Sequence, residues 1–130
     1  MNPLLLDIVN YFVANKLAQG DGIDCFRDFS PEEPDNIIVL TEYKGDEVPN
    51  YETDVVHRSV QITTRNTDAD AARACALDLA KSLKSDTKFI QFNEKRWGQV
   101  TLRQPPFKIE QDENKRTIYG FNIGITTSIE

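Results

Sequence analysis

Residues 55–83 constrain the fold most, because a two-residue alternation changes there, at one boundary, to a helical period. One face of the strand predicted over residues 56–65 carries Val56, Arg58, Val60, Ile62 and Thr64, and the other carries His57, Ser59, Gln61, Thr63 and Arg65. The first face is the more apolar, so we expect the strand to be half buried.

A helix with one apolar stripe is predicted directly after this strand. The stripe follows the i, i+3, i+4 spacing through Ala72, Cys75, Ala76, Leu79, Ala80 and Leu83. Thr67 and Asp70 have the spacing of a capping box at its start. Because the first stripe residues are small, we expect the helix to lie close to a sheet.

A second amphipathic helix of about 16 residues is predicted at the N-terminus. Asn2 and Pro3 suit its start, and Gly20 is placed to end it. Leu4, Leu6 and Tyr11 widen the apolar face, which indicates burial on two sides or a face left for a partner. We favour the extra core contact.

The remaining pattern predicts strands separated by polar turns. Residues 36–43 are almost continuously apolar at their start, residues 23–29 and 89–92 are short, and residues 97–104 alternate until Pro105 and Pro106 stop or bend the strand. After a polar turn over residues 111–115, residues 116–128 alternate with Gly120 and Gly124 on the reverse face. These glycines imply close packing on that face or strong coiling of the strand.

Residues 44–54 contain four acids, one Gly and one Pro without periodicity, and so predict a long, mobile acidic loop. Two interpretations remain: a solvated loop, which we favour, or an arm that touches a neighbouring subunit. Together the elements predict one α+β domain over residues 1–130. We expect a mixed or antiparallel sheet of five to six strands, covered on one face by two helices in the order α-β-β-β-α-β-β-β.

Charge and cysteine usage narrow the class of protein. The chain of 130 residues has a formal net charge of -6, which argues against binding to duplex DNA through clustered cations. Cys25 and Cys75 lack the spacing of metal ligands. We expect both to be reduced cysteines whose side chains serve in packing. No stretch is apolar for the length that spans a bilayer, and no signal peptide is evident at the start, so we expect synthesis in the cytoplasm and no membrane contact.

The sequence gives little support for catalysis. His57 is the only histidine and falls on a polar strand face, and neither nucleophile-elbow nor phosphate-loop spacing occurs. We therefore expect that the protein is not an enzyme and that it binds neither a cofactor nor a metal ion. One edge of the fold is a candidate for binding an acidic partner, if it gathers Arg58, Arg65, Lys95, Arg96, Arg103 and Arg116. For each of these residues taken singly, we favour a solvated charge at the surface.

The ordered pattern resembles the bacteriophage minor capsid proteins that act as tail terminators or head-tail joining proteins. The residues that carry the likeness are an LTEY-like strand end, an acidic loop, a V-Q-I-x-x-R strand (Val60, Gln61, Ile62, Arg65), an Ala-rich helix ending at Leu83, and a later run with Pro106, Phe107, Asp112, Glu113, Arg116, Phe121 and Asn122. The likeness covers residues 37–127. Two features depart from the pattern: the polar segment 93–96 follows the helix, and the N-terminal strand carries no recognisable signature.

This resemblance implies a structural virion protein of the tail or neck, which forms a ring, commonly a hexamer, on the tail tube. Its implied partners are copies of itself, the major tail tube protein and a head connector or stopper protein, with DNA passing through unbound; an acidic ring suits such passage. The alternatives are a neck stopper or connector adaptor, or a bacterial small-ligand or regulatory module. The candidate subunit-contact residues are Lys44, Asp46, Glu47, Tyr51, Arg58, Arg65, Arg103 and Arg116.

Overall fold

The predicted element order is confirmed in a computed structural model, which describes residues 3–43, 55–83, 90–91 and 97–128. The elements are α1 (Pro3–Ala14), β1 (Cys25–Arg27), β2 (Ile37–Tyr43), β3 (Val55–Asn66), α2 (Ala69–Leu83), β4 (Ile90–Gln91), β5 (Trp97–Gln111) and β6 (Thr117–Ser128). The predicted acidic loop at 44–54 lies outside the described residues.

The strands form one mixed six-stranded sheet in the order β1-β2-β3-β6-β5-β4. β1 runs parallel to β2, and every other neighbouring pair is antiparallel. The long β3 and β6 strands pair at the centre, where Val60 lies opposite Ile123 and Ile62 opposite Phe121. The predicted α+β class with a mixed sheet is thus confirmed.

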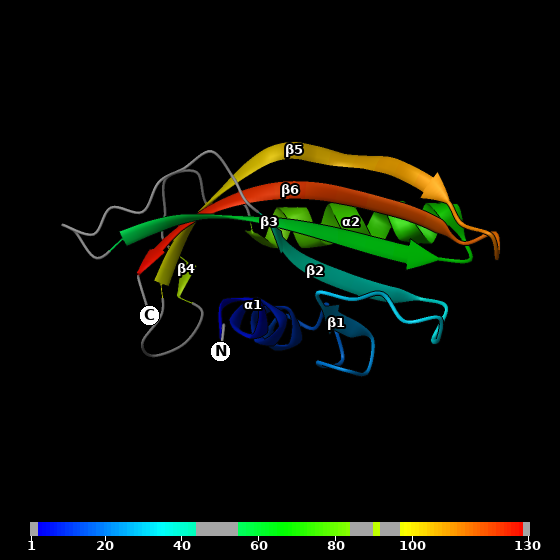
Figure 1. The fold of residues 1–130 in the computed structure, drawn as a ribbon, viewed down its shortest axis with the longest axis horizontal. Helices are drawn as coiled ribbons and strands as arrows, with labels where there is room; N and C mark the ends of the chain where they lie inside the picture. Colours follow the sequence, from blue (N-terminus) through cyan, green and yellow to red (C-terminus); the bar gives the residue numbers. More distant parts are fainter. Residues whose placement is uncertain (1–2, 44–54, 84–89, 92–96, 129–130) are drawn as a thin grey trace.

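The core lies between the sheet and two helices (Figure 1). α2 packs across β3, β6 and β5, and α1 lies beside β1 and β2. The fully buried side chains of the central strands, such as Ile62 and Phe121, join those of both helices in one apolar cluster. Five of the six predicted stripe positions of α2 belong to this cluster or pack against it, and the sixth, Ala72, is buried as well. We call the opposite side of the sheet, which carries Gly120 and Gly124, the helix-free face.

The N-terminal helix buries more than one stripe, as we favoured. Leu4 is fully buried, and the Tyr11 hydroxyl donates a hydrogen bond of 2.9 Å to the carbonyl oxygen of Ser82 at the end of α2. The added apolar width of α1 therefore includes residues that join it to the core and to the other helix.

The predicted end of α1 at Gly20 is wrong. The helix ends at Ala14, and Lys16 adopts a left-handed conformation with φ of 62°. The amide of Leu17 donates a hydrogen bond to the carbonyl oxygen of Phe12 at 2.8 Å, and the amide of Lys16 donates one to the carbonyl oxygen of Val13 at 3.0 Å. These bonds form a Schellman motif in which a lysine occupies the position that usually holds glycine.

The predicted capping box of α2 is also wrong. Asp68, and not Thr67, caps the helix, because its carboxylate accepts a hydrogen bond from the amide of Asp70 at 3.1 Å. The amide of Thr67 instead donates to the Asn36 side chain at 3.2 Å. The helix consequently begins one residue later than the box implied.

Pro105 and Pro106 do not stop the strand. β5 continues to Gln111 and keeps pairing with β6, with register shifts between Leu102 and Phe107. β4 pairs only with the first two residues of β5, so no described strand uses the outer edge of β5 beyond them. Prolines are tolerated there, because neither Pro105 nor Pro106 has a register partner on β6 and no described strand pairs with the outer edge of β5 at that point.

Close packing at the two glycines of β6 confirms the first of the two predicted reasons. A Cβ atom added at Gly120 would lie 2.7 Å from Cδ1 of Ile109, and one added at Gly124 would lie 2.7 Å from Nε of Arg103. Both side chains come from β5 and lie over the helix-free face. Glycine is therefore needed here for space.

Candidate functional site

Two buried arginines hold the 30–36 loop against the end of the sheet, at the right in Figure 1. Arg65, the next to last residue of β3, donates to the carbonyl oxygens of Glu32, Pro34 and Asp35 at 3.2, 2.7 and 3.1 Å, and to the Ser30 hydroxyl at 3.2 Å. The guanidinium fork supplies the several donors that such a loop needs. We call Arg65 and Arg116 the arginine clamp.

Arg116 enters the clamp from the turn between β5 and β6. Its Nη1 donates to the carbonyl oxygen of Glu32 at 2.6 Å, and its Nε donates to the Asp112 carboxylate at 2.8 Å. The other Asp112 oxygen accepts from the Arg116 amide at 2.9 Å, which closes the turn. The turn residues thus set the side chain that reaches the loop.

Charge and burial shift the pKa values in this cluster. Burial lowers the pKa of the Arg65 guanidinium, and the nearby charge of Arg116 lowers it further. Burial opposes ionisation of Asp112, but the hydrogen bonds from the Arg116 amide and guanidinium outweigh it and hold the pKa of the carboxyl below its usual value. Burial also opposes the charge of Arg116, whose pKa is nevertheless raised by the bond to Asp112.

The clamp changes how these two candidate contact residues are interpreted. Arg65 is 7% exposed and Arg116 3% exposed, so both guanidinium groups are engaged within the subunit. Our expectation of a half-buried β3 is met on its helix-facing side, but Ser59 and Arg65 on the helix-free face are buried too. Arg65 is buried because the 30–36 loop covers it, and the alternation of residues in β3 does not predict this contact.

The other candidate contact residues are placed separately. Arg58 forms a two-bond ion pair with Glu42 on β2, with both distances 2.6 Å, and is half-buried. Arg103 is exposed, with its guanidinium over Gly124. Lys44, Asp46, Glu47, Tyr51, Lys95 and Arg96 lie outside the described residues. The described arginines of the predicted basic set therefore do not form one edge patch.

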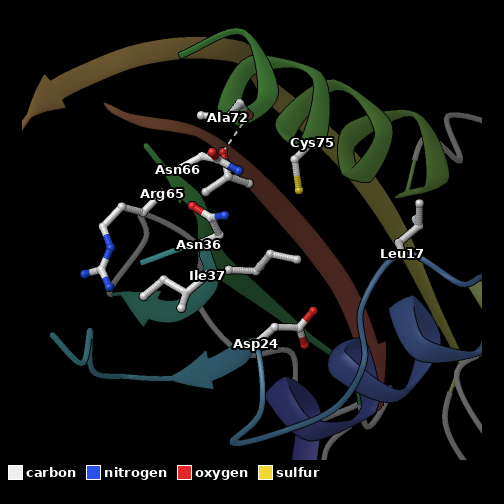
Figure 2. Close-up of a pocket in the computed structure, with 10 residues that line it drawn as sticks. Leu17, Asp24, Asn36, Ile37, Arg65, Asn66, Ala72 and Cys75 are labelled. Carbon is white, nitrogen blue, oxygen red and sulfur yellow. Dashed lines mark hydrogen bonds between the residues drawn. The ribbon is translucent and has the colours of Figure 1, made fainter. Parts of the chain in front are cut away.

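A small pocket lies between the start of α2, the start of β2 and the end of β3 (Figure 2). It has a volume of about 140 Å³ and is lined in part by Leu17, Asp24, Ile37 and Cys75. Figure 2 shows the Cys75 side chain pointing from α2 toward this space, while the Arg65 guanidinium points away from it. Ligand sites usually occupy about 300–1,000 Å³, so this pocket is too small for a typical cofactor.

The cysteines are free thiols, and both belong to the core or pack against it. Burial raises the pKa of Cys25 to about 12 and that of Cys75 to about 11. Both thiols therefore stay protonated at neutral pH and are poor nucleophiles. The predicted role of both cysteines as packing residues is confirmed.

Four of the five large hydrophobic side chains that are exposed among the described residues lie at two opposite edges of the sheet, and the fifth, Tyr43, ends β2. Ile23 (56% exposed) and Phe29 (59%) flank β1, whereas Phe107 (38%) and Ile109 (40%) lie on β5. Next to β1 is an open hollow of about 460 Å³ lined by Asp21, Gly22, Phe26, Arg27, Asp28 and Phe29, which we call the β1 hollow. Sequence reasoning missed both places; the one signal was Phe107 and Ile109 at alternate positions after the double proline.

The described residues offer little for catalysis. His57 is exposed, and its Nδ1 lies 2.7 Å from the Thr126 hydroxyl. Among residues 3–43, 55–83, 90–91 and 97–128, no three His, Cys, Asp or Glu side chains are grouped so that they could hold a metal ion. Within the same ranges, no helix has the length and apolarity needed to cross a membrane.

Comparison with known proteins adds one positive finding. A family model described as "Bacteriophage tail terminator protein" matches residues 12–129, nearly the whole chain. The search of curated proteins found no match to this chain. The matched span contains all six strands and α2, and so includes the arginine clamp and both exposed edges.

Proposed function

Because this chain belongs to the bacteriophage tail terminator family and is thus a structural protein of the phage tail, we propose that it forms a ring that stops tail-tube growth. In this proposal the ring, most simply a hexamer, sits on the end of the tube and provides the surface that the head connector or stopper protein meets. The observation that carries the proposal is the family match over residues 12–129.

Two features of the subunit support a function in which it assembles with copies of itself. Exposed apolar side chains lie at opposite edges of one sheet, and repeated contacts between different edges lead to rings when the rotation closes. Each chain also carries a net charge of -6. A ring of such subunits presents like charge to DNA, which favours passage over binding.

Growth of tail tubes in the presence of the purified protein tests the proposal. The major tail tube protein is polymerised with and without the subunit, and tube lengths and ends are measured by negative-stain electron microscopy. Termination predicts shorter tubes of narrower length distribution with ring-shaped density at one end. Unchanged lengths with bare ends would contradict it, and density bound to connectors but not to tubes would indicate a neck stopper or adaptor.

A further inference from the structure

We propose that Phe107, Lys108 and Ile109 of one subunit, the β5 patch, dock into the β1 hollow of a second copy of this chain. The inference rests on the proposed ring and names the surfaces that build it. β1 and β5 are separated in the sheet by β2, β3 and β6, so the two surfaces lie on opposite sides of the subunit. A contact between them joins unlike surfaces, and each subunit keeps one of each for its next neighbour.

The β1 hollow is a firm receptor with an aromatic wall. The Phe26 and Phe29 rings meet edge to face, with centroids 5.5 Å apart and an interplanar angle of 72°. Arg27 and Asp21 are joined by two hydrogen bonds of 2.9 Å, which fix another side of the hollow. Phe26 is buried whereas Phe29 is 59% exposed, so one ring anchors the wall and the other is available to an incoming side chain.

The rim of the hollow is acidic. Asp28 is exposed and has a left-handed φ of 64°, and its amide donates to the carbonyl oxygen of Leu40 at 2.8 Å. This bond ties the backbone of Asp28 to β2 and leaves the carboxylate at the surface. A partner that fits must bring an apolar side chain together with a cation.

The β5 patch has that chemistry. Phe107 and Ile109 are 38% and 40% exposed, and the exposed Lys108 lies between them in the chain. Cδ1 of Ile109 would lie 2.7 Å from a Cβ at Gly120, so its side chain rests on the helix-free face. Phe107 pairs with Gly120 and lies with Ile109 on the helix-free face, whereas Lys108 pairs with Tyr119 and lies on the helix-facing side of the same edge strand. The patch therefore offers two apolar side chains on one side of this edge and one ammonium group on the other.

The same strand disfavours pairing by strand addition. Pro105 and Pro106 lack amide hydrogens, and β5 has register shifts on both sides of Phe107. A neighbour cannot extend the sheet through a regular ladder there, so contact through side chains is favoured. A second copy is the occupant we infer, because its β1 hollow supplies an aromatic wall for the apolar side chains and Asp28 for Lys108.

A charge swap tests the contact. We compare Lys108→Asp, Asp28→Lys and the double variant with wild type, using native mass spectrometry and electron microscopy of rings, free and on tail tubes, at 0.15 M salt. Each single variant should weaken assembly about fivefold or more, and the double variant should recover to within about threefold of wild type. Arg73→Asp is the matched control, because it reverses an exposed charge on α2 and should change assembly less than about twofold.

The outcomes separate this contact from the proposed function. If wild type forms rings and stops tubes but the single variants do so equally well, or the double variant is no better than either, the contact is wrong and the function stands. If the single variants form rings but no longer bind tubes, the surfaces serve the tube protein, which overturns the second-copy contact. If wild type neither assembles nor stops tubes, both proposals fail. Circular dichroism of each variant verifies folding.

Discussion

At the scale of single residues, the arginine clamp decides how the polar end of the subunit is built. One guanidinium, that of Arg65, serves four oxygen acceptors of the 30–36 loop, three of which are backbone carbonyls. Backbone carbonyls that lose their donors inside a protein cost free energy, because water cannot replace the lost bonds fully. The loop therefore depends on a side chain that is more than 30 positions away in sequence from most of its acceptors.

Removing this side chain should be costly. We expect Arg65→Ala to lower the free energy of unfolding by about 3 kcal/mol, since it leaves several acceptors without donors and opens a cavity. Urea denaturation followed by circular dichroism measures the change. Arg73→Ala is the matched control: Arg73 is exposed on α2, and its loss should change stability by less than about 0.5 kcal/mol. Equal effects of both substitutions would show that the clamp contributes little.

The Asp112 carboxyl predicts a pH dependence. Its pKa lies below the usual 3.8 in the folded chain because of hydrogen bonds from Arg116. The unfolded state therefore binds more protons in the acid range, so the stability from this carboxylate is present above the unfolded pKa and is lost as pH falls through the folded one. We expect wild type to be more stable than Asp112→Asn at pH 7, and the difference to shrink below about pH 4. A difference that stays constant down to pH 2.5 in urea titrations would contradict the assignment.

At the scale of elements, the end of α1 stores a small backbone strain. Lys16 holds a φ of 62°, a conformation that costs most residues about 1 kcal/mol and glycine almost nothing. We expect Lys16→Gly to raise the free energy of unfolding by about 0.5–1 kcal/mol and the melting temperature by a few degrees. Gly22→Ala provides the reverse comparison, because Gly22 has a φ of 81° and should lose stability on substitution. A melting temperature lowered by Lys16→Gly would argue against the Schellman motif.

The sequence was a good guide to elements whose signal is local. The alternation of β3 and β6 and the apolar stripe of α2 report burial on one face directly, so the element order and the core were predictable. The ends of the helices were less predictable from the sequence. Asp68 caps the start of α2 and Lys16 takes the left-handed position after α1, but neighbouring residues could also have filled these positions. The continuation of β5 past Pro105 depended on which edge of the strand is unpaired, and a single strand's sequence does not specify this.

The site was less predictable than the fold. Arg65 and Arg116 were expected at a surface as single charges, yet each is buried by a loop that is distant in sequence. Phe29 and Phe107 are ordinary apolar residues in sequence, and only the strand order places them at opposite edges. The prediction of the site therefore lacked the knowledge of which distant segments meet in the fold. The residue types themselves were known from the sequence.

At the scale of the whole molecule, assembly must bring together subunits that repel one another. Each chain carries a net charge of -6, whereas the proposed contact adds one attractive pair at a solvent-exposed rim. Such a pair contributes about 1 kcal/mol or less, so the apolar side chains of the β5 patch and the β1 hollow must supply most of the attraction. Between 0.01 and 0.15 M salt the Debye length falls from about 30 to about 8 Å, which screens the long-range repulsion more than the close pair.

We therefore expect self-association of the wild-type subunit to strengthen about fivefold from 0.01 to 0.15 M sodium chloride, as measured by analytical ultracentrifugation. Arg73→Asp makes each subunit two charges more negative without altering either proposed contact surface, so its association should respond to salt more steeply than that of wild type. Association that weakens steadily with salt would mean that close ion pairs outweigh the net charge. The apolar docking of Phe107 and Ile109 would then be a minor part of the interface, because attraction between ions is the component that salt reduces.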